Sequence, residues 1–313
     1  MKAAVVFDPT TGPVYADFPR PDADASHRLI QVQAAAISHV VKSRAAGTHY
    51  SFNSTQPFVA GIDGVGLTQH GERVWFVMPV APWGSMAEWT LVSAENCLPL
   101  PEALSTVDAA AMGNPGMSAW AALVNRAGFQ AGETVLINGA TGSAGQLAVQ
   151  IARHLGAKKI IATGRNPAAL ERCGADVSLP LGAENLAAQL AEQATGQIDV
   201  VIDYLWGDSA LQILSALAKY TPSTRPVRYM QVGSLSGADI SLPGAILRSS
   251  PIQLMGSGIG SLSMAELVAA TAQMFQAAIP GGFTIATTPC PLSNVAEAWA
   301  VDDSKKRTVF TLS

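Results

Sequence analysis

The chain has 313 residues, of which 49% are hydrophobic and 13% charged, so a large buried core is expected rather than disorder. Its net charge of -4 offers no basic field that would attract nucleic acid or an anionic membrane surface. No apolar run is long enough to span a bilayer, and the N-terminus lacks the apolar stretch and cleavage site of a signal peptide.

The first hundred residues are predicted to be rich in strands. Apolar runs at 28–37 and 73–81 have strand character, and segments rich in Gly, Pro, Asn, Ser and Asp separate them. A helical pattern follows at about 106–126. These patterns indicate a β-rich first domain that ends near this helix.

From about residue 133, short apolar runs alternate with helical patterns, which is typical of a doubly wound parallel sheet. The tail offers one helix and a last strand that returns to the first part of the chain. We therefore expect an α/β fold with a discontinuous domain at 1–115 and 285–313 and a second domain at 116–284. The predicted strands of the second domain are 133–138, 158–163, 175–179, 198–204, 228–233 and 252–257, and the predicted helices are 143–155, 167–173, 184–194, 208–219 and 263–277.

The sharpest signal is the sequence ETVLINGATGSAGQLAVQIARHLGA, in which a strand meets a Gly-rich turn and then a helix with one apolar stripe. A β-carbon at Gly142 would block a pyrophosphate from the helix N-terminus, and Gly145 lets the helix pack close to the sheet. Strand, turn, helix and following strand together favour a dinucleotide site over a Gly-rich turn without a ligand. The turn is a G-x-G-x-x-G variant with Ala in the first place, and its predicted cofactor-binding residues are Ala140, Thr141, Gly142, Ser143, Ala144 and Gly145.

The end of the second strand indicates which nicotinamide cofactor is bound. An NAD enzyme usually carries an acid about 20 residues past the glycines, but this chain reads Gly164-Arg165-Asn166 and has its next acid at Glu171. Gly164 leaves room for a phosphate, and Arg165 is a permanent cation with a planar fork that suits one. The alternative is a solvated Arg165, with Asn166 serving only as the N-cap before Pro167. The missing acid and the supplied arginine favour NADPH.

Taken in order, these segments resemble a known family. The stretch 132–166 looks like the cofactor-binding segment of the zinc-independent quinone oxidoreductases and enoyl reductases of the medium-chain dehydrogenase/reductase superfamily. Segments 57–66, 84–102 and 108–123 are similar to that family's Gly-x-Asp/Glu-x-x-Gly turn, its Gly-x-x-Ala-Glu-Tyr strand and the helix before its cofactor domain. The resemblance implies a GroES-like catalytic domain interrupted by a Rossmann domain, and a homodimer, as in many members.

The resemblance also implies that no zinc is bound. Zinc-dependent relatives place their first cysteine ligand at the position of Ser38, and the histidine of their Gly-His-Glu turn is here Ile62. His39 and His49 remain as ligand types, but they have no third partner at ligand spacing. The three cysteines are scattered, which excludes a four-cysteine zinc loop and favours a reducing compartment. We therefore expect a cytoplasmic protein without a metal.

Without a Lewis acid, hydride transfer from NADPH requires an acceptor that is already electrophilic, such as a quinone or an α,β-unsaturated carbonyl. Tyr50 is the first candidate proton donor, because it lies where related enoyl reductases carry a Gly-x-Tyr motif and is protonated at pH 7. The alternative is a loop tyrosine packed over the core. His49 would orient Tyr50 or protonate the product, and the favoured alternative is a solvated loop histidine without a catalytic role. Ser38 replaces an asparagine usual in quinone reductases, and would hydrogen-bond the substrate carbonyl or nothing.

The remaining candidates belong to the predicted nicotinamide site. Ser118 stands where the family has Thr before Ala-Trp, and would contact the nicotinamide ribose or amide. Gly233, Gly256 and Ser257 end predicted strands, where doubly wound folds bind ligands, although ordinary turns would explain them equally. Two other functions stay open: a 2-enoyl thioester reductase, for which no Lys/Arg cluster is seen, and an NADPH-binding regulatory or structural protein without turnover.

Overall fold

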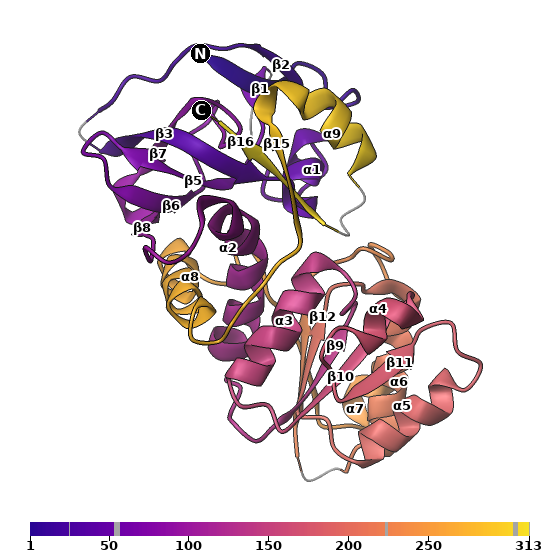
Figure 1. Cartoon of the computed structure of the whole chain (residues 1–313). Coiled ribbons are helices and arrows are strands. Elements are labelled where there is room, and N and C mark those ends of the chain that lie inside the picture. The colour runs from indigo at the N-terminus through magenta and orange to yellow at the C-terminus, as the bar shows by residue number, and fades with distance from the viewer. Residues whose placement is uncertain (25, 53–56, 223–224, 303–305, 313) are drawn as a thin grey trace. The chain divides into compact units, whose positions relative to one another are not determined.

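The fold is described from a computed structural model that covers residues 1–24, 26–52, 57–222, 225–302 and 306–312. The chain divides into two compact units (Figure 1). Unit 1 comprises Met1–Met117 and Leu267–Ser313, and unit 2 comprises Ser118–Glu266. Both boundaries fall inside helices, namely α2 (Thr106–Trp120), which a π-helical segment at Ala121–Arg126 continues, and α8 (Met264–Ala278).

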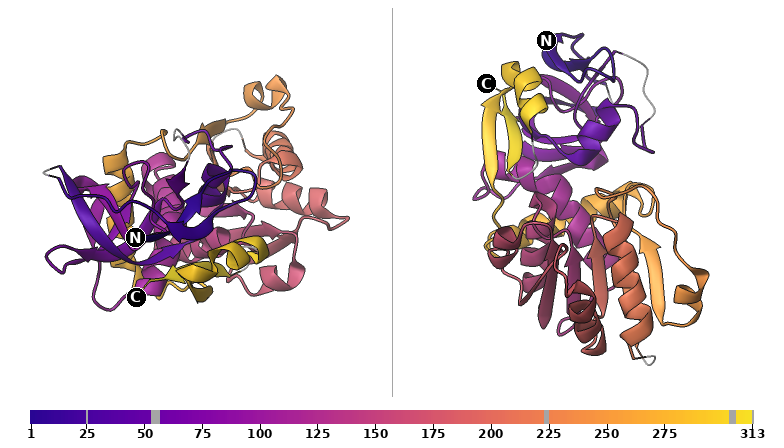
Figure 2. Two further views of the ribbon diagram at one scale, coloured as in Figure 1. Left: turned by 90° about the horizontal axis from the view of Figure 1, so that it is seen from above. Right: turned by 90° about the vertical axis from the view of Figure 1, so that its right-hand side faces the viewer.

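Unit 1 is rich in strands and contains both chain termini. Its larger sheet has the strand order β15-β16-β3-β5-β6-β8, with β7 also paired to β3, and its smaller sheet has the order β2-β1-β4. The last strand, β16, lies antiparallel beside β3, so the C-terminal segment belongs to the same sheet as strands from the first hundred residues (Figure 2). Its elements are β1 (Lys2–Val6), β2 (Val14–Asp17), β3 (His27–Ala36), α1 (His39–Ala45), β4 (Phe58–Val59), β5 (Asp63–Thr68), β6 (Arg73–Val77), β7 (Trp89–Ser93), β8 (Cys97–Pro99), β15 (Thr287–Pro291), α9 (Val295–Val301) and β16 (Arg307–Thr311).

The return to unit 1 begins at Leu267, whereas the sequence predicts it at residue 285. The difference arises because most of α8 packs within unit 1. The Phe275 ring meets the edge of the Trp75 indole at a centroid distance of 5.9 Å. Met274 covers Gly116 so closely that a Cβ there would lie 2.6 Å from its terminal methyl group. Helix α8 is amphipathic, and the periodicity of its apolar residues does not indicate which of the two units its apolar face covers.

Unit 2 is built on a six-stranded parallel sheet with the order β11-β10-β9-β12-β13-β14. From the central β9 the chain moves outward to β10 and β11, then returns to place β12 on the other side of β9. This reversal is the topological switch point at which doubly wound sheets bind ligands, at the carboxyl ends of their strands. The elements are β9 (Thr134–Asn138), α3 (Ser143–His154), β10 (Lys159–Gly164), α4 (Pro167–Glu171), β11 (Val177–Pro180), α5 (Leu186–Thr195), β12 (Val200–Asp203), α6 (Gly207–Tyr220), β13 (Val227–Gln231), α7 (Gly244–Arg248) and β14 (Ile252–Gly256).

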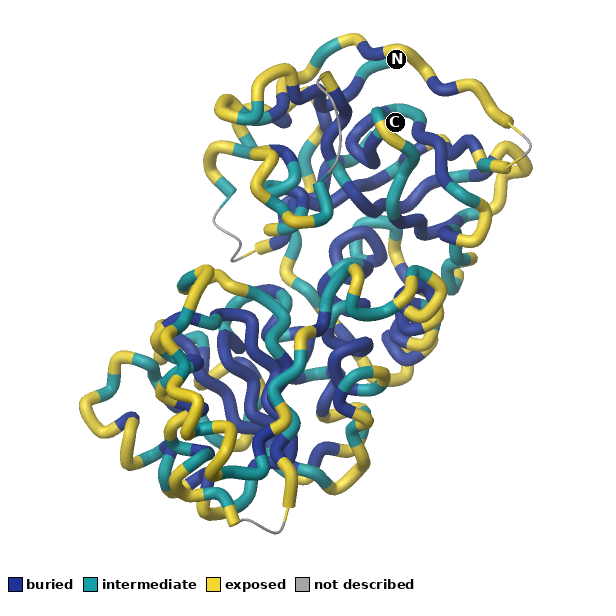
Figure 3. The backbone as a smooth tube through the Cα atoms, turned by 180° about the vertical axis from the view of Figure 1, so that it is seen from behind, coloured by how far each residue is buried: buried dark blue, intermediate teal, exposed yellow. Residues whose placement is uncertain are grey.

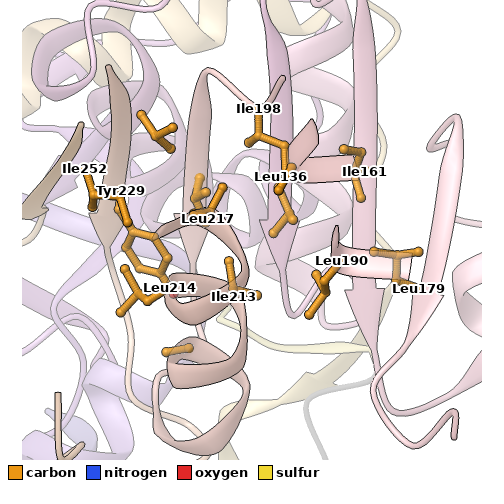
Figure 4. Close-up of a cluster of buried hydrophobic side chains, with 14 of the residues drawn as sticks. Leu136, Ile161, Leu179, Leu190, Ile198, Ile213, Leu214, Leu217, Tyr229 and Ile252 are labelled. Carbon is orange, nitrogen blue, oxygen red and sulfur yellow. The ribbon is translucent and has the colours of Figure 1, made fainter. Parts of the chain in front are cut away.

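The core of unit 2 holds the sheet in place beneath these strand ends. Buried apolar side chains from the strands meet those of α5 and α6 on one face (Figure 4). The strands are buried along the tube, and the connecting loops are mostly exposed (Figure 3). Among the described residues, no helix combines the length and the apolarity that crossing a membrane requires. The labelled core residues are Leu136, Ile161, Leu179, Leu190, Ile198, Ile213, Leu214, Leu217, Tyr229 and Ile252.

Candidate functional site

The turn between β9 and α3 begins with Gly139, one residue before the predicted first position. Gly139 has φ +94°, a conformation that L side chains rarely adopt, and a Cβ there would lie 2.9 Å from Leu205. The N–H groups of Gly139 and Ala140 donate to the Thr163 carbonyl at 3.1 and 2.9 Å, which ties the turn to the neighbouring strand β10. Gly139 therefore serves as the tight-turn glycine, and the following residue is free to be alanine.

The other two glycines of the turn have different surroundings. A Cβ at Gly145 would lie 2.2 Å from the Gly139 carbonyl oxygen, so this glycine is required for the close approach of α3 to the turn. At Gly142 a Cβ would meet only the same oxygen, at 3.9 Å, so the protein itself leaves that space open. Gly142 is the N-cap of α3 and provides no side chain to cap it. The space beside Gly142 is thus open at the start of α3, where the N–H groups and dipole of a helix favour an anion.

Arg165 and Asn166, the two residues that follow β10, differ in their contacts. Asn166 is the N-cap of α4: its side chain accepts a hydrogen bond from the Ala169 N–H at 3.1 Å, and Pro167 follows at the first helical position. Arg165 is exposed and has no hydrogen-bond or ion-pair partner among the described residues. Gly164 does not leave the open room that the sequence suggests, because the Thr141 side chain lies within 2.6 Å of where its Cβ would be.

Three further predicted residues lie at the ends of β13 and β14. At Gly233 a Cβ would meet the Tyr204 carbonyl oxygen at 2.8 Å, so close backbone packing accounts for this glycine. Gly256 has open space around it, and its carbonyl accepts from Arg126 Nε at 3.0 Å. Ser257 is buried, and its N–H donates to Gln231 at 2.9 Å. These strand ends are therefore ordered by the protein's own contacts.

Ser118, the first residue of unit 2, lies beside the buried phenol of Tyr204. Burial raises the pKa of Tyr204, and the nearby Ser118 hydroxyl partly opposes that rise. The phenol oxygen of Tyr204 forms no hydrogen bond with the described residues, so Ser118 approaches it without bonding to it. Ser118 is thus located near the carboxyl end of β12, where Tyr204 follows the strand.

A buried network around Asp203 supports these strand ends, and the sequence analysis did not identify it. The carboxylate accepts from Asn138 Nδ2 and from Tyr229 Oη, both at 2.7 Å, and from the Leu205 and Trp206 N–H groups. Burial raises the pKa of Asp203, and these hydrogen bonds oppose the rise. The network joins the carboxyl ends of β9 and β12 to the middle of β13. The sequence signal for this network is an acidic residue at the end of an otherwise apolar strand. Such a strand has no alternation of apolar and polar residues that would point to the acid.

The three predicted catalytic residues lie in unit 1. Ser38 is buried as the N-cap of α1, and its hydroxyl accepts from the Val41 N–H at 3.2 Å. Tyr50 is 73% exposed, and its ring stacks on His49 at a centroid distance of 4.3 Å. The structure therefore brings His49 and Tyr50 together, while Ser38 has a structural task. Among the described residues, no three His, Cys, Asp or Glu side chains group in a way that would hold a metal ion.

Comparison with known proteins identifies the family of this chain. Residues 144–273 match the family described as zinc-binding dehydrogenase. The chain is 30% identical to the probable NADPH-dependent quinone reductase tdiC of Emericella nidulans over 94% of both chains. The chain belongs to the medium-chain dehydrogenase/reductase superfamily, in its zinc-independent, quinone oxidoreductase-like branch. Human quinone oxidoreductase, another relative of this branch, is 27% identical over 86% of this chain and 83% of its own.

Solved structures support the fold of this branch member. The quinone oxidoreductase from Thermus thermophilus, described alone and in its complex with NADPH, superposes with a TM-score of 0.82 over the whole of both chains. At 23% identity this likeness concerns the fold alone. A probable oxidoreductase from Mycobacterium abscessus is 26% identical, with a TM-score of 0.81 over 100% of this chain and 99% of its own. The Rossmann-type sheet and the separate β-rich unit are therefore those of the superfamily.

Proposed function

We propose that this protein is an NADPH-dependent oxidoreductase that reduces a quinone or an α,β-unsaturated carbonyl without a metal. The observation that carries the proposal is the open space at Gly142 at the start of α3, together with the exposed arginine that directly follows the neighbouring strand β10. The relative from Emericella nidulans, whose name includes NADPH and quinone reduction, supports the same cofactor and substrate class.

The residues of unit 2 fit the two charged parts of the proposed cofactor. The first N–H groups of α3 would bind the pyrophosphate, because they have no side-chain cap at Gly142 and the helix dipole favours an anion there. Arg165 would bind the 2′-phosphate, since its guanidinium has no competing partner among the described residues. Bound NADPH supplies the hydride. Thr141, Ser118 and the ends of β13 and β14 would border the remainder of the cofactor.

In unit 1 the proposed chemistry depends on a proton donor. Tyr50 is largely exposed, and its ring stacks on that of His49. The Ser51 N–H donates to His49 Nδ1 at 3.1 Å, so this nitrogen is an acceptor and the ring proton lies on Nε2. Burial and the charge of Arg44 lower the pKa of His49, which keeps the ring neutral. We therefore assign proton donation to Tyr50 and its orientation to His49.

The proposal is tested by following NADPH oxidation at 340 nm with a panel of quinones, enones and enoyl thioesters. We expect turnover with quinones or enones and none without an acceptor. A preference for enoyl thioesters alone would make the protein a thioester reductase. Tight NADPH binding without oxidation by any acceptor would contradict the proposal in favour of a regulatory or structural role.

A further inference from the structure

A narrow apolar pocket in unit 1 lies between α1, the start of β4, the start of β5 and the loop that follows β6. Its cavity volume is about 40 Å³, which is more than one water needs. Its walls include the rings of Phe52, Phe58 and Trp83 and the side chains of Ile62 and Met78. A narrow, aromatic-walled space of this kind suits one flat ring.

Arg44 brings the only charge to this lining among the described residues. It lies in the last turn of α1, is half-buried, and burial lowers the pKa of its guanidinium. No acidic residue occurs between positions 44 and 63 of the sequence, and no described carboxylate forms an ion pair with Arg44. A half-buried cation without a counter-ion is costly, so this position favours an anion from outside the chain.

One edge of the Arg44 guanidinium is already occupied. Nη1 donates to the carbonyl and to the hydroxyl of Ser51, at 2.7 and 2.8 Å. Neither Nε nor Nη2 has an acceptor among the described residues, so three N–H groups remain for a ligand. The guanidinium also lies 5.8 Å from the centre of the Phe52 ring, at the limit of a cation–π contact. Arg44 is therefore held in place and keeps part of its donor fork open.

The same contacts connect the pocket to the predicted proton donor. Ser51, which accepts from Arg44, also approaches His49 Nδ1 with its hydroxyl at 2.8 Å, and His49 stacks on Tyr50. Since His49 is neutral, Arg44 is the one positive charge in this short network among the described side chains. A ligand anion placed on Arg44 would thus lie within the loop that positions Tyr50.

We infer that the pocket binds an acceptor whose flat ring bears an ionised oxygen, a carboxylate or an enolate, which pairs with the open edge of Arg44. This inference rests on the proposed function, because it specifies the acceptor of that reaction. The apolar walls select the ring, and the guanidinium selects the charge. Neutral acceptors of the same shape would bind more weakly, because they leave the half-buried cation unpaired.

The inference is tested by titrating benzoate and its neutral isostere benzamide into the whole protein and measuring Kd from ligand NMR signals. We expect wild type to bind benzoate about tenfold more tightly, as a charge-assisted hydrogen bond contributes. Arg44→Gln should bind the two equally, and Arg44→Lys should keep a reduced preference, because lysine lacks the planar fork. Ser51→Ala, which removes one contact to Arg44 but not the charge, should keep the full preference.

Equal affinities in wild type would overturn the inference, and this comparison stands even if a variant fails to fold. A full preference for benzoate in folded Arg44→Gln would overturn it as well. Neither probe is reduced, so the result is independent of turnover. Loss of the preference together with active quinone reduction would contradict the anion site alone, whereas a preference without NADPH oxidation by any acceptor would contradict the reductase function alone.

Discussion

Arg165 and Asn166 are adjacent in the chain but have separate tasks. The Asn166 side chain is used by the α4 N-terminus, and the Arg165 guanidinium is left exposed without a partner among the described residues. An arginine that contributes no contact to the fold can be removed without loss of stability, so any effect of its removal reports on a ligand. The two residues illustrate how a structural and a binding role share one strand end.

If Arg165 holds the 2′-phosphate, Arg165→Ala should weaken NADPH binding and leave NADH binding nearly unchanged. The loss of a charge-assisted phosphate contact is worth about 1.5–3 kcal/mol, roughly 10- to 100-fold in Kd. Nicotinamide fluorescence titrations with both cofactors measure the two affinities. Equal losses for NADPH and NADH would remove Arg165 from the 2′-phosphate site.

A single substitution at Tyr50 distinguishes enone reduction from quinone reduction. Tyr50→Phe keeps the ring that stacks on His49 and deletes only the hydroxyl. An enone needs a positioned proton after hydride transfer, and general-acid assistance typically contributes about 10²–10⁴-fold, whereas a quinol oxygen can take its proton from water. We expect a much larger loss of kcat with enones than with quinones, and unchanged NADPH affinity. A variant equal to wild type on every accepted substrate would make Tyr50 a packing residue.

Single residues were the hardest features to assign from sequence. The Gly164 position looked like room for a phosphate, but the Thr141 side chain occupies it, because a glycine pattern does not reveal which neighbour approaches. The cap role of Asn166 was visible in its local sequence, since Pro167 follows it. Arg44 carries no local sequence signal for a binding role, because most of its neighbours in the pocket come from other segments of the chain.

At the scale of elements, the β9–α3 turn separates folding from binding. Gly145 is required by the protein, since a Cβ would lie 2.2 Å from the Gly139 carbonyl oxygen. Gly142 faces open space, so only a ligand would require a glycine there. Substitutions at Gly142 and Gly145 therefore form a matched pair, in which the first tests ligand binding and the second tests folding.

We expect Gly145→Ala to lower the free energy of unfolding by about 1–3 kcal/mol or more, through overpacking against the turn. Gly142→Ala should change it by less than about 1 kcal/mol, because only the N-cap residue differs, and should weaken NADPH binding strongly. Urea denaturation and NADPH titration of both variants provide the measurements. Normal NADPH affinity in Gly142→Ala would contradict pyrophosphate binding at this helix end.

The elements themselves followed closely from periodicity in unit 2. Helix α3 was expected at 143–155 and spans Ser143–His154, and α6 was expected at 208–219 and spans Gly207–Tyr220. Such helices carry one apolar face against a sheet, and this pattern is local. In unit 1 the order of strands in the sheet depends on pairing between distant segments, such as β16 with β3, which no local pattern specifies.

At the scale of the whole molecule, membership of the zinc-independent branch leads to a prediction about metals. The described residues offer no group of three His, Cys, Asp or Glu side chains that would hold a metal. Activity should therefore survive exhaustive chelation, and elemental analysis should find less than one zinc per chain. A tightly bound zinc that is lost together with activity would contradict the interpretation of Ser38 and Ile62 as replaced ligands.

The central claim is that hydride passes from NADPH to an electrophilic acceptor bound to this protein. The most direct measurement is single-turnover oxidation of NADPH that carries deuterium in either of the two positions at C4, with the best acceptor from the panel. Single turnover isolates the chemical step from binding and product release. We expect slower oxidation with deuterium in one of the two positions and an unchanged rate with deuterium in the other. Equal rates for both deuterated forms and for unlabelled NADPH, with chemistry shown to limit the turnover, would contradict it.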